Sequence, residues 1–346
     1  MAARLIAGFV LAATFAATAL ADDVDAKRIE ELWKKGSEWQ VGEAEHIKKV
    51  GDAKLALIAA GEPALKHALT RLVTTDGLEI RCLDEVLLGL KEKSIGPLIE
   101  RVGDKDVNVR RNVGRILGSF NAKKDDKDEV GIAEADIRRI SAALLVQNAK
   151  EDDPSAKYWQ LIGPARWKDE KALPLIIELS KSANERVRVR SVALLGNSRD
   201  HKDALARFVE LLNDDRYFVR DAAADELKKS GQPGAQTCQD KAVELNRKDK
   251  LDARDARLLR LLMTIIGANN VGQPAWELAG SLGKHEDANV RGDSYTLAAN
   301  LALQDPKQAE TSAFPEVCKA YLEMMREIEI NPYAKACLEA ALERVK

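Results

Sequence analysis

The chain has 346 residues, of which 45% are hydrophobic, 32% are charged and only 5% are aromatic, and its formal net charge at pH 7 is −2. This near-neutral balance excludes the global basic field by which proteins attract nucleic acid. A chain of this length needs either two domains or a core that extends along a repeat array. Abundant alanine and leucine with few aromatic residues are typical of a helical protein.

The first 21 residues predict a secretory signal peptide. A short basic start, Met1 to Arg4, precedes an apolar run over residues 5–20, and the small-residue site Ala19-Leu20-Ala21 follows. The run is too short and too rich in alanine for a comfortable membrane span, so we expect cleavage after Ala21. The product would be exported, periplasmic or secreted, and no later stretch is apolar enough to span a membrane. An uncleaved N-terminal anchor is the alternative.

Residues 22–60 are predicted to form an N-terminal helical cap, and residues 61–305 a repeat array. The array is marked by a recurring string: an apolar residue followed by arginine, a small or polar residue four positions after the apolar one, leucine or alanine four positions later, and often a closing glycine. Strong copies begin at Ile80-Arg81, Val109-Arg110, Val187-Arg188, Val219-Arg220 and Val290-Arg291. This spacing keeps the apolar positions on one face of a helix, and the glycine ends that helix.

Each string follows another helical segment and a short polar link that carries aspartate, such as residues 103–106, which can cap the second helix. Every repeat is therefore predicted to be a helical hairpin. Residues 121–133 are a charged insert in one connection, expected to be a mobile loop. Residues 306–346 depart from the string and are predicted to be a C-terminal capping hairpin.

The string Asp106-Val-Asn-Val-Arg-Arg-Asn-Val-Gly-Arg-Ile-Leu-Gly118 resembles HEAT repeats, particularly the short subclass named after phycocyanobilin lyases. The resemblance is good over residues 61–120 and 170–231 and weaker over residues 121–169 and 232–346. It implies an all-α fold, a right-handed α-solenoid or superhelix of about eight or nine helical hairpins. Such arrays serve mostly as binding scaffolds and occasionally as lyases or sensors.

Two sets of residues are candidates for binding a partner. The recurring arginines either receive anions along one face or pair with aspartates of the links, and pairing is favoured because the guanidinium fork suits bidentate bonds. Three aromatic residues near the insert either form an exposed binding surface or fill space in a degenerate repeat, and burial is favoured. The candidates are Arg81, Arg110, Arg188, Arg220, Arg291, Tyr158, Trp159 and Trp167.

The four cysteines have no metal-binding or redox spacing, but export to an oxidising compartment makes a disulfide between Cys318 and Cys337 a candidate, because both fall in the last hairpin. The alternative is four small buried hydrophobes. The four histidines are scattered, and no string typical of a nucleophile elbow, a phosphate loop or a calcium loop occurs. We therefore expect no metal, no cofactor and no catalytic residue.

The leading hypothesis is a non-enzymatic exported scaffold, expected to be a monomer, that binds a protein or peptide through the concave surface of the second helices. One alternative is a structural component of an envelope or secreted assembly. The other is an enzyme similar to bilin lyases, for which the sequence shows no convergent polar pocket.

Overall fold

The computed structural model describes residues 26–121, 131–248, 251–269, 273–303 and 314–345. The predicted signal peptide and residues 122–130 of the charged insert lie outside these ranges. Helices dominate the described residues, which contain no β-strand. The all-α prediction is confirmed.

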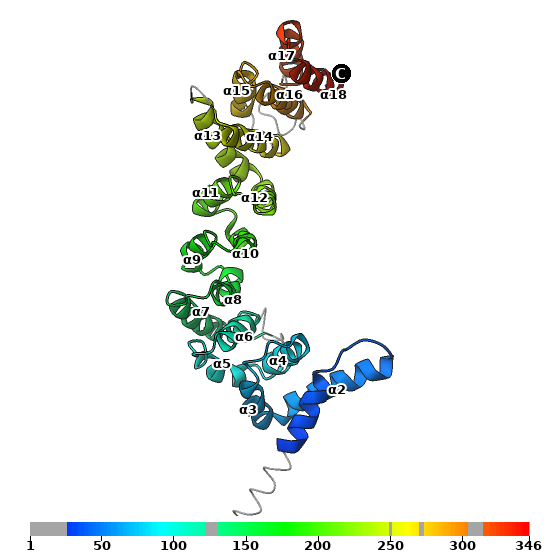
Figure 1. Ribbon diagram of the computed structural model, residues 1–346, viewed down its shortest axis with the longest axis vertical. Helices are drawn as coiled ribbons and strands as arrows, with labels where there is room; N and C mark the ends of the chain where they lie inside the picture. Colours follow the sequence, from blue (N-terminus) through cyan, green and yellow to red (C-terminus); the bar gives the residue numbers. More distant parts are fainter. Residues whose placement is uncertain (1–25, 122–130, 249–250, 270–272, 304–313, 346) are drawn as a thin grey trace, which may run out of the picture. The chain divides into compact units, whose positions relative to one another are not determined.

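The described residues form nine successive helical hairpins, in agreement with the predicted eight or nine (Figure 1). The first consists of residues 26–36 and α2 (Ala44–Ala60). The others pair α3 (Glu62–Thr70) with α4 (Gly77–Gly89), α5 (Glu92–Ile99) with α6 (Val107–Leu117), α7 (Glu134–Asn148) with α8 (Pro154–Arg166), α9 (Ala172–Leu179) with α10 (Glu185–Leu195), α11 (Lys202–Leu211) with α12 (Tyr217–Lys229), α13 (Gln232–Asn246) with α14 (Ala253–Ala268), α15 (Gln273–Leu282) with α16 (Ala288–Ala302), and α17 (Phe314–Ile328) with α18 (Pro332–Arg344). A 3₁₀ turn, η1 (Gly196–Ser198), extends α10.

The second helix of most hairpins begins at a side-chain cap. Within the described residues, an aspartate or asparagine at the N-cap accepts backbone N–H groups at seven of the nine second helices. These caps satisfy donors that a helix start leaves unpaired. The second helices without one are α2 and α12, and the N-cap residue of α12 is Arg216.

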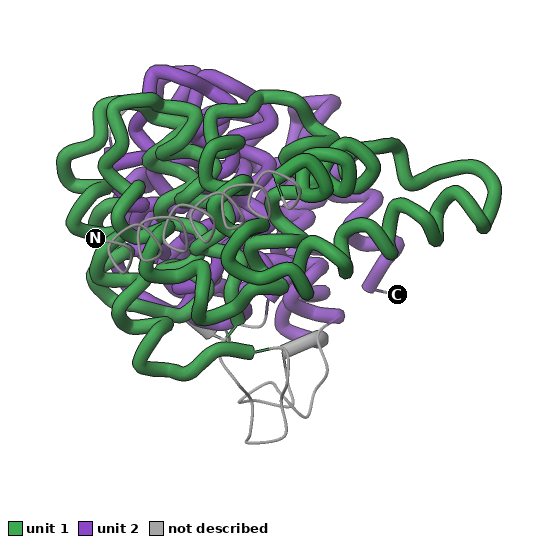
Figure 2. The backbone as a smooth tube through the Cα atoms, turned by 90° about the horizontal axis from the view of Figure 1, so that it is seen from below, with its two compact units in different colours: residues 1–175 green, residues 176–346 purple. Residues whose placement is uncertain are grey.

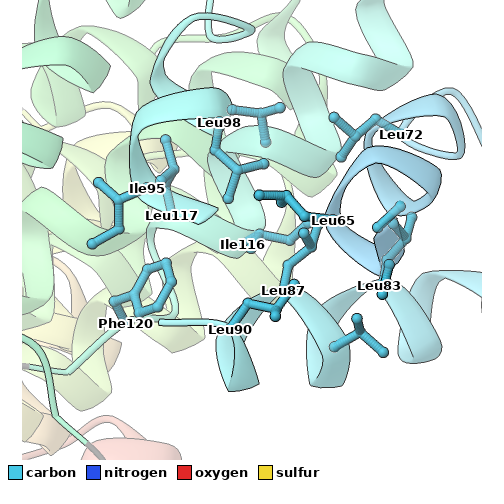
Figure 3. Packing of buried hydrophobic residues seen from close by; sticks show 14 of the residues in the cluster. Leu65, Leu72, Leu83, Leu87, Leu90, Ile95, Leu98, Ile116, Leu117 and Phe120 are labelled. Carbon is cyan, nitrogen blue, oxygen red and sulfur yellow. The ribbon is translucent and has the colours of Figure 1, made fainter. Parts of the chain in front are cut away.

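The chain divides into two compact units, Met1–Leu175 and Ile176–Lys346, with the boundary inside α9 (Figure 2). In unit 1, α3 to α7 enclose a leucine-rich core in which Leu65, Leu87 and Ile116 lie close together (Figure 3). Ile132 is buried in this core, and its N–H donates to the carbonyl oxygen of Asn121 at 2.8 Å. The two described ends of the insert are therefore anchored to each other.

Neighbouring hairpins stack in the same way in each unit. Second helices pack on second helices, as α4 does on α6 and α6 on α8 in unit 1, and α10 on α12, α12 on α14 and α14 on α16 in unit 2. First helices likewise meet first helices, and Figure 1 shows α11, α13 and α15 on one side of unit 2 with α10, α12 and α14 on the other. The links that join the two helices of each hairpin are thereby brought close to the second helix of the preceding hairpin.

Candidate functional site

Four of the recurring arginines hold the same place in their hairpins. Arg110, Arg188, Arg220 and Arg291 each stand four residues after the N-cap of a second helix. The Nη1 atom of each donates to the two backbone carbonyl oxygens that precede the N-cap, at distances of 2.7 to 3.1 Å. These bonds fix the guanidinium plane against its own link and leave the Nε and Nη2 edge for another acceptor.

At three places that second edge bonds to a carboxylate of the next hairpin. Arg110 donates to Glu151 at 2.7 and 2.8 Å, Arg188 to Asp214 at 2.8 and 3.0 Å, and Arg291 to Glu329 at 2.7 and 2.9 Å. Each carboxylate stands two residues before the next N-cap and accepts the backbone N–H of that N-cap residue as well. We call this arrangement a closed joint.

The carboxylates of the closed joints are held in their ionised form. The bonds from Arg291 chiefly lower the pKa of Glu329, to about 2, with further donation from the N–H of Asn331 and the hydroxyl of Tyr295. Burial raises the pKa of Glu151 and of Asp214, but the hydrogen bonds and positive charge of their arginines, together with donation from the backbone N–H of the N-cap residue, outweigh it, so both pKa values are lowered. The closed joints are therefore ion pairs at neutral pH.

The same bonds act on the arginines of the closed joints. Donation to the partner carboxylate is the main reason why the pKa values of Arg110, Arg188 and Arg291 are raised. These three candidate binding residues already have an acceptor within the chain, which matches the pairing that the sequence favoured.

Arg81 does not share this position. It stands five residues after the N-cap Asp76, so Ile80 takes the place that arginine has in α6. Its side chain is exposed, and its Cζ lies 5.8 Å from the ring centroid of Trp39. Arg81 and Arg110 therefore occupy the same place in the sequence string, but their positions relative to the helix start differ by one residue.

Arg220 has the position but lacks the partner. Its Nη1 donates to the carbonyl oxygens of Asp214 and Asp215 at 2.7 and 3.1 Å, but no described carboxylate bonds to its Nε or Nη2. The equivalent acceptor would be residue 250, two before the N-cap Asp252, and the sequence has Lys250 there, outside the described residues. We call this place the open joint.

Two large aromatic side chains stand beside the open joint. Tyr217 and Phe218, in the first turn of α12, are 68% and 47% exposed, and the Cζ of Arg220 lies 5.9 Å from the ring centroid of Tyr217. The repeat pattern of the sequence does not single out this pair. An alignment of the repeats would have shown it, because the two equivalent positions hold no aromatic residue in other repeats. They are Val107 and Asn108 in α6 and Ala288 and Asn289 in α16.

The three aromatic candidates do not form one exposed surface. Tyr158 and Trp159 are half-buried on α8, with their rings edge-on and their centroids 5.2 Å apart. Trp167 is the C-cap residue of α8 and packs against the core of unit 1, where its Nε1 donates to the carbonyl oxygen of Phe120 at 3.3 Å.

The cysteines are free thiols in this structure, so the candidate disulfide between Cys318 and Cys337 is not formed. Cys318 is buried in α17, whereas Cys337 lies against α16, where its Sγ would be 3.0 Å from a Cβ placed on Gly292. Helix α18 thus turns Cys337 toward α16 rather than toward α17. Burial raises the pKa of the Cys318 and Cys238 thiols to about 12, which keeps them protonated.

A groove of about 700 Å³ adjoins the link that precedes α12. It runs between α11, α13 and the start of α14, and Asn213 and Arg254 form part of its wall. The Nη2 of Arg254 donates to the backbone oxygen of Asn213 at 2.7 Å, while the side-chain oxygen of Asn213 is buried without a hydrogen-bond partner. A polar ligand in this groove would meet an unused acceptor.

A smaller hollow of about 420 Å³ lies in unit 1, between residues 26–36 and α3, and His67 forms part of its wall. In the described part of the chain no three His, Cys, Asp or Glu side chains gather as they would to hold a metal ion. No described helix is both long and apolar enough to cross a membrane.

Comparison with family models assigns part of the array. Residues 142–228 match the model of HEAT repeats. These residues are HEAT repeats. The match begins in α7 and ends in α12, so it includes the closed joint of Arg188 and the first half of the open joint. No curated protein matches the chain in sequence.

The solved structures of importin beta and Kap95p share this fold. Importin beta is 11% identical, with a TM-score of 0.53 over 98% of this chain and 49% of its own. Kap95p, in a structure with RanGDP, is 10% identical, with a TM-score of 0.54 over 92% of this chain and 44% of its own. YibA of Escherichia coli is 13% identical, with a TM-score of 0.43 over 89% of this chain and 98% of its own.

The chain thus spans about half the length of importin beta and Kap95p. Identities this low establish the fold alone. The resemblance to HEAT repeats that the arginine strings indicated is confirmed.

Proposed function

We propose that the protein is a non-enzymatic, exported scaffold that binds a protein or peptide partner on the side of the array formed by the second helices. The observation that carries the proposal is the exposure of Tyr217 and Phe218 at the start of α12. Aromatic side chains of this size are favoured as anchors of protein interfaces, and burying them against a partner removes apolar surface from water.

Two further observations support the proposal. The array has the fold of importin beta and of Kap95p, and the latter binds RanGDP. The signal-like pattern of residues 1–21 is the reason to expect that the partner is met outside the cytoplasm.

The test is capture of cross-linked partners by the chain without residues 1–21, from the exported fraction of its source. The matched variants are Tyr217→Ser with Phe218→Ser, and Val146→Ser, which alters a side chain that is 61% exposed on the first helix α7. We expect one dominant protein with the wild type and with Val146→Ser, and its loss with the double variant. Equal recovery by all three proteins would overturn the proposal.

A second candidate, self-assembly, is favoured by the last described hairpin. Val317, Met324 and Ile328 lie on one face of α17 and are exposed, and the adjacent Ile330 is 91% exposed. Helices α11 and α13 are each covered by the first helix of the following hairpin, whereas no hairpin follows α17 among the described residues. A second copy of the chain would provide such a cover.

Sedimentation velocity over a range of concentrations tests this candidate. Self-assembly predicts a sedimentation coefficient that rises with concentration in the wild type but not in Met324→Ser with Ile328→Ser. A coefficient independent of concentration in both proteins would exclude it.

A further inference from the structure

The open joint presents Arg220 in the same way as the arginines of the closed joints. The Nη1 of Arg220 bonds to the two carbonyl oxygens of its link at 2.7 and 3.1 Å, and the Nη1 of Arg188 does so at 2.9 and 3.1 Å. The guanidinium is therefore already oriented before any partner arrives, which reduces the entropy lost on binding.

The closed joints identify the chemistry that fits the remaining edge. At all three, the acceptor is a carboxylate that receives two parallel N–H bonds from Nε and Nη2. Planar bidentate pairing of this kind is stronger than a hydrogen bond between neutral groups and fixes the geometry of the pair. The chain has Lys250 at the position from which the matching carboxylate would come, and lysine cannot accept a hydrogen bond.

The surroundings restrict what can bind. Arg216 pairs with Glu185 at 2.6 Å, and Asp214 pairs with Arg188, so neither adds free charge. The remaining neighbours in the chain include the exposed carboxylates of Asp215 and Asp221. Because these oppose a general attraction for anions, binding depends on the bidentate geometry of Arg220 and on apolar contact with the neighbouring aromatic rings.

We propose that the open joint is a receptor for an aspartate or glutamate side chain of a partner, with an apolar residue next to it that covers Tyr217 and Phe218. This inference rests on the proposed scaffold function and names the chemistry of its ligand. The partner carboxylate takes the place that Glu151, Asp214 and Glu329 have at the closed joints.

The experiment follows the arginine Nε–Hε signals of the ¹⁵N-labelled chain during titration with the blocked dipeptide N-acetyl-Leu-Glu-amide. We expect a saturable shift of the Arg220 signal with a Kd in the millimolar range, while the signals of Arg110, Arg188 and Arg291 stay in place. The matched control is N-acetyl-Leu-Gln-amide, which has the same shape without the charge. Absence of a saturable Arg220 shift up to about 50 mM probe, or an equal shift with the glutamine control, overturns the inference.

Two variants locate the binding edge. Arg220→Lys keeps the charge but loses the fork, so binding should weaken at least about tenfold. Lys250→Glu puts a carboxylate of the chain itself two residues before the N-cap Asp252, and it should also displace the probe. Unchanged binding by Arg220→Lys would show that charge alone attracts the probe and would overturn the bidentate receptor.

A third variant, Asp249→Asn, removes the carboxylate next to Lys250 in the sequence. Binding no weaker than that of the wild type is expected, and tighter binding would mean that Asp249 competes for Arg220. Weaker binding would count against the receptor, because Asp249 would then be needed for it.

Failure of the carboxylate receptor can be distinguished from failure of the proposed scaffold function. If the partner captured by the wild type is captured equally by Arg220→Lys, the scaffold function stands and the receptor fails. If nothing is captured but the dipeptide binds, the receptor stands and the protein partner is in doubt.

Discussion

The joint between α6 and α8 is closed, and the joint between α12 and α14 is open. In the first, Arg110 meets Glu151, whose side chain is only 1% exposed, and the helices approach closely at Gly114, where a Cβ would lie 3.0 Å from the backbone nitrogen of Gln160. In the second, Arg220 makes the same bonds to its own link but finds no described carboxylate.

One arginine position thus serves two purposes in this chain, and a different residue decides between them. The residue two before the next N-cap is Glu151, Asp214 or Glu329 where the joint is closed, and Lys250 where it is open. An arginine with an internal carboxylate holds two hairpins together. An arginine without one keeps two donors for a partner.

The largest expected effect comes from opening a closed joint. Glu151→Ala leaves the Arg110 guanidinium, 17% exposed, without its counter-ion, and removes an acceptor of the Gln160 amide. Removing one partner of a buried ion pair costs about 3 to 5 kcal/mol of unfolding free energy. Urea unfolding followed by circular dichroism measures it.

The matched control is Glu134→Ala. This carboxylate pairs with Arg138 on the surface of α7, with both side chains more than half exposed, and such pairs contribute about 1 kcal/mol or less. Equal losses of unfolding free energy in Glu151→Ala and Glu134→Ala would contradict the role assigned to the closed joint.

The next largest effect is a dependence of the unfolding free energy on pH, caused by Glu329. Because the folded pKa of Glu329 is about 2, below its ordinary value of 4.5, its ion pair stabilises the fold fully above pH 4.5, and this stability is lost as pH falls toward 2. A shift of this size corresponds to about 3 kcal/mol. Other joints titrate in the same direction, so the loss is measured as the difference between wild type and Glu329→Gln.

The variant should be less stable than the wild type at neutral pH and should approach it in acid. Thermal unfolding at a series of pH values below 5 gives the comparison. Parallel curves for the two proteins would mean that Glu329 does not carry this pH dependence.

A smaller effect is expected at the open joint. Arg220→Ala removes two bonds to neutral carbonyl oxygens but leaves no carboxylate unpaired among the described residues, so the cost should be about 1 to 2 kcal/mol. Arg188→Ala removes the corresponding bonds and also leaves Asp214 without its ion pair. Urea unfolding should therefore show the larger loss for Arg188→Ala, and the reverse order would remove the distinction between the joints.

Much of the fold could be predicted from the sequence because its signals are local. The spacing of apolar residues around Val109-Arg110 and Val187-Arg188, with Asp106 or Asn184 at the helix start, defines a helix and its cap within a dozen residues. The expectation that arginine would pair with acidic residues followed from the geometry of its side chain.

The identity of the acceptors could not be predicted in the same way. Glu151 is 41 residues from Arg110, and Asp214 is 26 residues from Arg188. The two sequence separations differ because helices and links vary in length. Only the stacking of hairpins brings each arginine and its acceptor together. The position of Arg81 could not be predicted from its string either. The string matches that of Arg110, but α4 begins one residue earlier relative to Arg81 than α6 does relative to Arg110.

The smallest and sharpest effect is expected from closing the open joint. Lys250→Glu puts a glutamate two residues before the N-cap Asp252, the sequence position that the acceptor carboxylate has at the three closed joints. A gain of about 1 kcal/mol would raise the melting temperature of a unit of this size by about 2 to 4 °C. Lys250→Gln, which removes the positive charge without adding a bidentate acceptor, is the control.

If the glutamate variant is more stable than the glutamine variant, and if Arg220→Lys cancels the gain, then the missing carboxylate is what distinguishes the two kinds of joint. If glutamate and glutamine give the same melting temperature, the edge of Arg220 is already satisfied in solution. The open joint would then be closed by another group of the chain, and its availability to a partner would have to be given up.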